Sequence, residues 1–205
     1  MPLQNRVSPF GELFASPARG TMFGNRGGKF HRDDKTLGKR HFASRQWICC
    51  VLEFKNRQRD VWGRYYTELF FLDEVTALAA GHRPCFECRR AEAEAFAAAW
   101  ARAEGADKRP RAPPMDIVLH AQRLDGRAKR LHRLPVKDLP DGAMISLENK
   151  AFAVKGDQLL HWTLEGYDAR RERPQQGDVD VLTPPAILAT LRAGYAPHWH
   201  ESAAS

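Results

Sequence analysis

Four cysteines have the residue type and spacing that most clearly indicate chemistry in this sequence. Cys49 and Cys50 are adjacent, whereas Cys85 and Cys88 are separated by two residues. Two thiolates three positions apart on a tight turn can reach one tetrahedral zinc ion, each at about 2.3 Å. Four cysteines at these positions do not resemble the disulfide framework of a small secreted protein. The Cys85–Cys88 spacing therefore predicts half of a zinc site.

The adjacent pair is expected to supply the other half. Neighbouring residues of a strand point to opposite faces, so only one of Cys49 and Cys50 reaches the metal easily. The second would then be a buried core thiol. A histidine, a carboxylate or water would complete the site, and an open position is the catalytic pattern of zinc. The candidate ligands are Cys49, Cys50, Cys85 and Cys88, and the candidates for a histidine ligand are His31, His41 and His82.

The charge of the chain is concentrated at its start. The 205 residues carry a formal net charge of +7, and the excess of Lys and Arg over Asp and Glu lies entirely in residues 1–60. Such asymmetry favours nucleic acid or another polyanion as a partner, with Phe23, Phe30 and Phe42 available to stack on bases. A solubilising surface around a hairpin is the alternative interpretation. The candidate phosphate contacts are Arg19, Arg26, Lys29, Arg32, Lys35, Lys39, Arg40 and Arg45.

Composition and motifs exclude several classes of protein. A hydrophobic content of 43% with 10% aromatic residues is globular rather than disordered. No apolar run approaches the roughly 20 residues that cross a bilayer, and Met1–Phe10 lacks the apolar core of a signal peptide. We therefore expect a soluble, cytoplasmic protein without a membrane partner. No HExxH, GxSxG or nucleotide-binding fingerprint is present.

The elements that position the cysteines are predicted from local patterns. Residues 21–31 read as a hairpin with a glycine-rich turn at 24–28. Gln46–Lys55 is nearly continuous in apolar residues and predicts a buried strand, with Val61–Phe71 as its partner. Asp73 is suited to cap a helix over 74–80 that ends at Gly81, and a second helix follows Cys88.

The proline-rich segment 105–114 predicts a linker. Beyond it we expect a helix over 115–124, strands over 142–154, 158–164 and 179–182, and a helix over 185–193. The predicted fold class is α+β, with a zinc-stabilised β-hairpin/helix unit followed by a small mixed sheet and a C-terminal helix. The predicted domains are 1–105, a basic hairpin with the zinc module, and 115–205, a small α+β domain, joined by a linker at 106–114.

Residues 69–90, LFFLDEVTALAAGHRPCFECRR, resemble the metal-binding module of the Ada family of DNA alkylation-repair proteins. The shared features are a strand ending in aromatic residues, a short Ala-rich helix and Gly-x-Arg-Pro-Cys-x-x-Cys. The likeness is clear over these 22 residues and looser over 46–90. It implies a four-cysteine zinc site, contact with the DNA backbone and, in the full family, methyl transfer from a DNA phosphotriester to a zinc-bound cysteine. The family has Cys-x-x-x-Cys on the upstream strand, where this chain has Cys49-Cys50.

These observations predict a zinc-binding, basic protein that binds nucleic acid, is directed to DNA and acts in DNA repair. One alternative is a zinc-thiolate alkyl acceptor that uses Cys49 or Cys50. Another is a metal-dependent nuclease built on His31 and the adjacent acids Asp33 and Asp34. A third is a zinc-stapled module for protein interaction.

Overall fold

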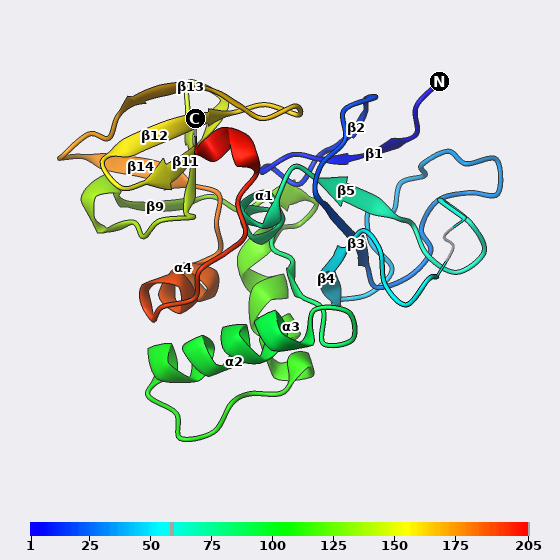
Figure 1. Cartoon of the computed structure of the whole chain (residues 1–205), viewed down its shortest axis with the longest axis horizontal. Coiled ribbons are helices and arrows are strands. Elements are labelled where there is room, and N and C mark those ends of the chain that lie inside the picture. Colours follow the sequence, from blue (N-terminus) through cyan, green and yellow to red (C-terminus); the bar gives the residue numbers. More distant parts are fainter. Residues whose placement is uncertain (58–59, 205) are drawn as a thin grey trace.

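Over residues 1–57 and 60–204, which the computed structural model describes, two six-stranded sheets and four α-helices form the protein (Figure 1). The first sheet uses strands from the first 84 residues and the second uses strands after residue 131. The predicted α+β class with a C-terminal helix is confirmed.

The first sheet is mixed and has β3 near its centre. Its order is β2-β1-β5-β3-β4-β6. β3 is antiparallel to both β4 and β5, whereas the β1–β5 and β4–β6 pairs are parallel. The strand bounds are β1 Gln4–Val7, β2 Leu13–Ala15, β3 Met22–Arg26, β4 Trp47–Val51, β5 Leu69–Phe71 and β6 Arg83–Pro84.

The predicted hairpin over 21–31 is wrong, because β3 runs straight through Gly24 and pairs with β4. Gly24 allows close strand packing rather than a turn: a Cβ there would lie 2.3 Å from the Ile48 carbonyl oxygen and 2.8 Å from the Phe71 ring. The chain turns instead after Arg26, where Gly27 and Gly28 adopt positive φ angles of 79° and 142°. The expected pairing of 61–71 with 46–55 is also wrong, since β5 pairs with β3 and β1.

The helices follow the local signals closely. α1 spans Glu74–Ala79 after Asp73, whose carboxylate accepts the Thr76 N–H at 2.8 Å, as its capping role predicts. α2 ends at a left-handed Gly105. No helix in the described residues combines the length and the hydropathy that a membrane crossing needs. The other bounds are α2 Arg90–Glu104, α3 Ala112–Arg123, α4 Pro185–Arg192 and the 3-10 helices Val136–Asp138 and Glu201–Ala203.

The second sheet has the order β13-β12-β11-β10-β14-β9, and every pairing described in it is antiparallel. The predicted strand over 142–154 is two strands, which reverse at Glu148 and Asn149 with positive φ angles of 53° and 60°. The bounds are β9 His132–Pro135, β10 Met144–Leu147, β11 Lys150–Lys155, β12 Gln158–Trp162, β13 Tyr167–Glu172 and β14 Asp178–Val181, with a separate ribbon of β7 Leu124–Asp125 and β8 Ala128–Lys129.

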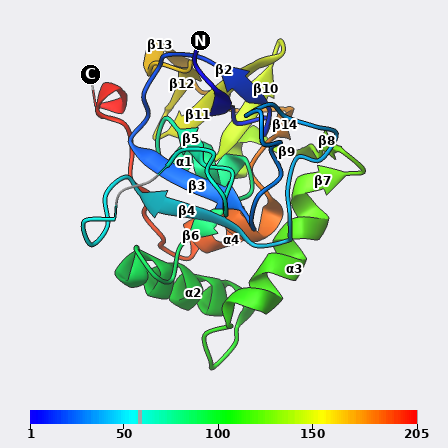
Figure 2. The ribbon, with the colours of Figure 1, turned by 90° about the vertical axis from the view of Figure 1, so that its right-hand side faces the viewer.

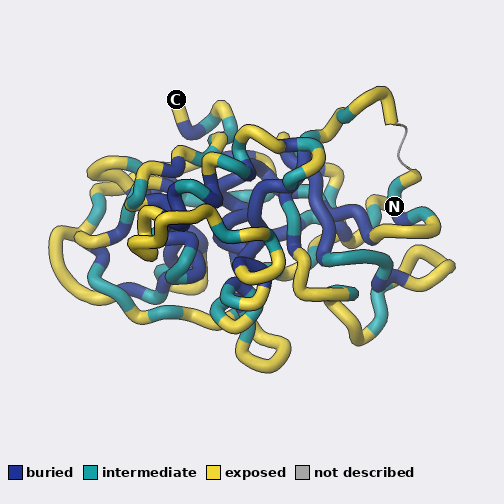
Figure 3. Tube along the Cα trace, turned by 90° about the horizontal axis from the view of Figure 1, so that it is seen from below, coloured by how far each residue is buried: buried dark blue, intermediate teal, exposed yellow. Residues whose placement is uncertain are grey.

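The two halves of the chain share their cores. Val75 and Ala79 of α1 pack with Met144 and Leu160 of the second sheet, and α2 packs on α4 beneath the sheets (Figure 1). Buried residues are concentrated toward the middle of the trace, and exposed residues lie mostly at its outside (Figure 3). The division at 106–114 stays a prediction. Residues 106–111 form the loop from α2 to α3, whereas 112–114 are the first residues of α3.

A buried polar junction fastens the C-terminal segment to the start of α1. The Glu74 carboxylate is fully buried and accepts two hydrogen bonds from the Arg89 guanidinium, at 2.9 and 2.8 Å. It also accepts the Tyr195 hydroxyl at 2.6 Å and the His198 N–H at 2.9 Å. Buried charges are tolerated only when they are paired and fully hydrogen-bonded. The path of residues 195–200 is therefore part of what makes this ion pair stable.

We expect Glu74→Gln to destabilise the protein by about 3–5 kcal/mol, because it removes the carboxylate that accepts two hydrogen bonds from the buried Arg89 guanidinium and leaves only the Glu92 carboxylate, 4.0 Å from the Arg89 Nε. Urea unfolding followed by circular dichroism measures this change. The control is Glu94→Gln, which breaks the exposed Arg90–Glu94 pair and should cost at most about 1 kcal/mol. Equal unfolding midpoints for the two variants would contradict the prediction.

Candidate metal centre

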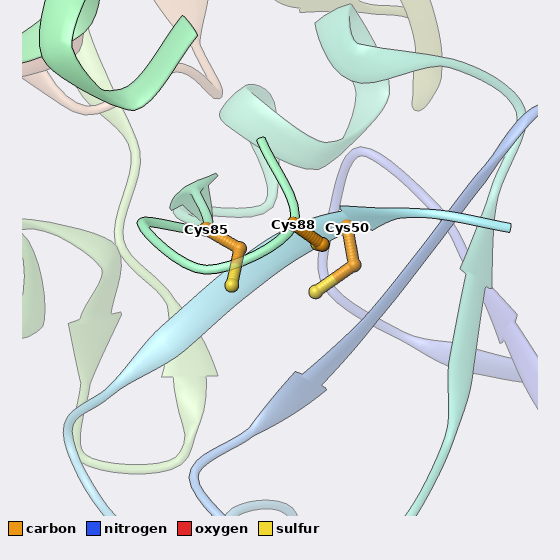
Figure 4. A group of neighbouring side chains, drawn as sticks. All are labelled: Cys50, Cys85 and Cys88. Carbon is orange, nitrogen blue, oxygen red and sulfur yellow. The ribbon is translucent and has the colours of Figure 1, made fainter. Parts of the chain in front are cut away.

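Three of the four cysteines meet at one point (Figure 4). Cys50 projects from β4, while Cys85 and Cys88 lie on the turn between β6 and α2. Their sulfur atoms all lie within 4.8 Å of one another. Tetrahedral zinc with bonds of about 2.3 Å separates its sulfur ligands by about 3.8 Å, so a small inward movement of the side chains suffices. The three thiols therefore fit a metal such as zinc.

The register of two short strands brings these residues together. β4 and β6 are parallel, with Ile48 opposite Arg83 and Cys49 opposite Pro84. The next residue on each strand is a cysteine, and the Cys85 N–H donates to the Cys49 carbonyl at 2.9 Å. The turn then closes with the Glu87 N–H directed at the Cys85 sulfur, 3.4 Å away. Backbone N–H groups directed at a ligand sulfur orient it and favour its thiolate form.

Cys49 lies on the opposite face of β4, outside this group. Its side chain is 0% exposed and packs with Leu69, Phe71 and Ala77. Its sulfur lies 3.6 Å from Nη1 of Arg89, and burial raises the pKa of its thiol. The alternation of side chains along a strand separates it from Cys50, so the structure gives Cys49 the position of a core thiol.

None of the three candidate histidines lies with the thiols. The His31 ring stacks on Trp62 at 5.1 Å and contacts the Thr67 hydroxyl at 2.8 Å. His82 is buried between Trp47 and Phe71. Within residues 1–57 and 60–204 the three cysteines form the only group of three or more His, Cys, Asp or Glu ligands, and neither His41 nor a carboxylate belongs to it.

Asp33 and Asp34, the acids of the nuclease hypothesis, lie on the surface and contact neighbouring residues. The Asp33 carboxylate pairs with Lys29 at 2.5 Å, and Asp34 accepts from the Thr36 hydroxyl at 2.6 Å. Both side chains are exposed, and neither forms a metal-binding group with His31 in the described part of the chain. This arrangement does not favour the nuclease hypothesis.

The three thiols are electrostatically coupled. Hydrogen bonds from the Cys50 and Cys88 thiols lower the pKa of Cys85, whereas hydrogen bonds to Cys85 and Cys88, together with burial, raise the pKa of Cys50. One thiolate is thus stabilised by two protonated neighbours. A cation at the centre would replace those protons, which is why thiolate sites release protons on metal binding.

The thiols open onto a cleft of about 1190 Å³. Several cations around it are already paired: Arg57 with Glu87 at 2.7 Å, and Arg90 with Glu94 at 3.0 Å. Two lining arginines, Arg64 and Arg111, have no salt-bridge partner among the described residues. The exposed rings of Tyr65 and Tyr66, 69% and 51% accessible, also line the cleft.

The structure separates the predicted phosphate contacts from the thiols. None of the eight basic residues predicted between positions 19 and 45 lines the thiol cleft. Arg26 is 1% exposed, and its guanidinium donates to the Gly11 carbonyl at 2.8 Å, so it does not lie on the surface. Lys29 pairs with Asp33, and Lys35 with Asp60 at 3.6 Å. Arg19, Arg32, Lys39, Arg40 and Arg45 are exposed.

Several residues that line the cleft beside the thiols were not predicted from the sequence. The segment Gly63-Arg64-Tyr65-Tyr66 was assigned to a strand because it is rich in aromatic residues, whereas the structure leaves it as an exposed loop. Two adjacent tyrosines beside an arginine, with a polar turn before them, were the signal that could have found this surface.

No protein-family model, curated protein or solved structure matches the chain. The likeness of residues 69–90 to the Ada module thus rests on the motif alone.

We expect Cys50→Ser, Cys85→Ser and Cys88→Ser each to lower the zinc content of the purified protein well below one equivalent. The matched control is the neighbouring variant Cys49→Ser, which should keep its zinc because Cys49 faces the other side of β4. Mass spectrometry of the native protein and inductively coupled plasma analysis measure the metal. Full zinc in Cys85→Ser, or its loss in a folded Cys49→Ser variant, would refute this ligand set.

Proposed function

We propose that this protein binds zinc through Cys50, Cys85 and Cys88 and binds nucleic acid, namely DNA, along the cleft above them, with a role in DNA repair. The observation that supports this proposal best is the position of the three thiols in a cleft that also contains unpaired arginines and exposed tyrosines. The repair role comes from the resemblance of residues 69–90 to the Ada module.

The role of zinc in this proposal is first structural. Cys50 belongs to β4, whereas Cys85 and Cys88 precede α2, so one ion would fasten the strand to the helix. A structural zinc site contributes on the order of 10 kcal/mol to folding in small domains. The ion would also offset most of the negative charge of the three thiolates, which lie next to the proposed path of an anionic strand.

The proposed binding of nucleic acid is supported by the arginine and tyrosine side chains that line the cleft. Arg64 and Arg111 offer guanidiniums that no carboxylate occupies among the described residues, and these suit phosphates. Tyr65 and Tyr66 present rings to solvent, and base stacking on such rings contributes about 1–3 kcal/mol per base. Both kinds of contact tolerate different sequences, so the proposal predicts weak sequence preference.

Fluorescence anisotropy with single-stranded and duplex DNA tests this proposal. Affinity should fall steeply between about 50 and 200 mM salt, and Arg64→Ala and Arg111→Ala should each make the log–log slope shallower by about one. Tyr65→Ala should weaken single-strand binding by about tenfold or more. Lys150→Ala, an exposed cation of the second sheet, is the matched control. An absence of binding at low salt would rule out the nucleic-acid function and favour the protein-interaction module.

A second candidate is a thiolate acceptor of alkyl groups, because all three sulfurs line the cleft and Cys88 is only partly buried. In this reaction a thiolate sulfur forms a bond to the methyl carbon of a phosphotriester. The carbon–oxygen bond breaks, and the phosphodiester leaves with the electron pair. Of the two acceptors predicted from the sequence, only Cys50 belongs to the group of thiols.

Exposure of the zinc-loaded protein to DNA bearing methyl phosphotriesters should add one methyl group to a cysteine of this group. Peptide mass spectrometry identifies the acceptor, and Cys49→Ser should react as the wild type does. Unchanged masses at all three cysteines after prolonged exposure would exclude alkyl transfer while leaving zinc and DNA binding intact.

A further inference from the structure

A second cleft, of about 700 Å³, lies on the other face of the first sheet. Ile48 and Cys50 face the thiol cleft, whereas Trp47 belongs to the second one, as expected from the alternation of side chains along β4. Its other walls include the segment 10–13 that leads from β1 into β2, the loop that leads from β3 to β4, the end of α3 and the β7–β8 ribbon. The last three lie side by side in Figure 2.

Positive charge dominates this cleft. Six lysines and arginines line it, against a single carboxylate, that of the exposed Glu12. Three of the cations lie at the exposed rim and three are partly or fully buried. The rim cations are Lys39, Arg40 and Arg127, and the inner cations are Arg26, Arg123 and Lys129.

Two of the three inner cations lie against one indole ring. The guanidinium carbons of Arg26 and Arg123 lie 4.1 and 3.9 Å from the centre of the Trp47 ring. Both arginines are 1% exposed. The Lys129 ammonium lies close by and donates to the Ala79 carbonyl. Together they form a compact group of positive charge under the floor of the cleft.

No carboxylate of the described residues forms a salt bridge with this group of cations. The contacts of the three inner cations are to carbonyl oxygens and to neutral rings. Arg123 donates to the carbonyls of Gly81 at 2.9 Å and Arg45 at 2.7 Å, while its Nε is buried with no hydrogen-bond partner. The carboxylate that raises the pKa of Arg123 is that of Asp116, which already accepts two hydrogen bonds from Arg83 at 2.8 Å.

Buried charges in proteins are normally paired, because the loss of hydration is otherwise uncompensated. Burial, together with the neighbouring Arg26 and Arg123, lowers the pKa of Lys129 to about 7. Burial, together with the Arg26 and Arg123 charges, holds the pKa of His82 well below its ordinary value, so that ring is neutral. These buried cations lose hydration and form no salt bridge within the described residues. Their position beneath an open cleft indicates a binding site for an anionic ligand, which would supply the missing negative charge.

We propose that this second cleft binds a phosphomonoester dianion, with Arg123 and Lys129 beneath the phosphate and Lys39, Arg40 and Arg127 around it. The volume lies in the range of about 300–1,000 Å³ typical of small-molecule sites and accommodates a mononucleotide. A compact, doubly charged terminal group fits an enclosed cluster of cations better than a phosphodiester of a continuous strand, which carries one charge and cannot enter deeply.

The phosphate could belong to a small molecule or to the 5′ end of a nucleic acid strand, and the two sources share the same chemistry. This inference does not depend on the thiol cleft, because none of the residues that line the second cleft lines the first. Zinc binding and DNA binding at the thiols can therefore fail without affecting it.

Isothermal titration calorimetry at constant ionic strength tests the proposal with four probes: inorganic phosphate, a nucleoside monophosphate, and an oligonucleotide with either a 5′-phosphate or a 5′-hydroxyl. We expect saturable binding of phosphate with a stoichiometry of one. A free ligand is the natural occupant if the monophosphate binds more tightly than the oligonucleotides do. A strand end is the occupant if the 5′-phosphorylated oligonucleotide binds at least tenfold more tightly than its 5′-hydroxyl counterpart.

Lys129→Met and Arg127→Ala should each weaken phosphate binding by at least about tenfold, as the loss of one charge-assisted hydrogen bond predicts. Arg127 is exposed at the tip of the ribbon, so its variant remains informative if the Lys129 variant does not fold. Lys108→Ala, an exposed cation outside both clefts, should bind as the wild type does. Absence of saturable phosphate binding, or unchanged affinity in Arg127→Ala, would overturn the proposal.

Discussion

The buried ion pair between Glu74 and Arg89 is the constraint on which the rest of the structure depends. Glu74 begins α1, and Arg89 directly follows the cysteine turn, so the pair fixes the turn against the helix. A carboxylate without any exposed surface needs all its acceptor positions filled, and Tyr195 and the His198 N–H fill those that Arg89 leaves. The position of two of the three grouped thiols therefore depends on a segment more than a hundred residues further along the chain.

Alternate side chains of strand β4 line two different clefts, one on each face of the first sheet. Cys50 joins the thiol cleft, while Trp47 and Cys49 face the opposite side, where Arg26 and Arg123 lie against the indole and Lys129 lines the same cleft. A single layer of backbone separates a site suited to a soft cation from a site suited to an anion. Electrostatics favours this separation, because cations among the thiols would oppose metal binding.

Local signals predicted much of the fold and half of the candidate metal site. The Asp73 cap, the helix end before Gly81 and the Cys85–Cys88 turn depend on neighbouring residues, and the structure has all three. Strand pairing was predicted less well. Gly24 suggested a turn because glycine is common there, but its role is to let β3 approach Ile48 and Phe71, which no local pattern reveals. The expectation that Arg26 contacts a partner at the surface failed for the same reason, since burial depends on the whole fold.

The sequence by itself determined the thiols at 85 and 88, the helices beside them and the rule that Cys49 and Cys50 face opposite ways, because these follow from backbone geometry over a few residues. Only the tertiary structure decided which of the two joins the cluster, through the parallel register of β4 with β6. It alone also gathered the inner cations from β3, the end of α3 and β8. Their proximity depends on contacts between segments that are distant in the sequence, and local sequence patterns do not predict such contacts.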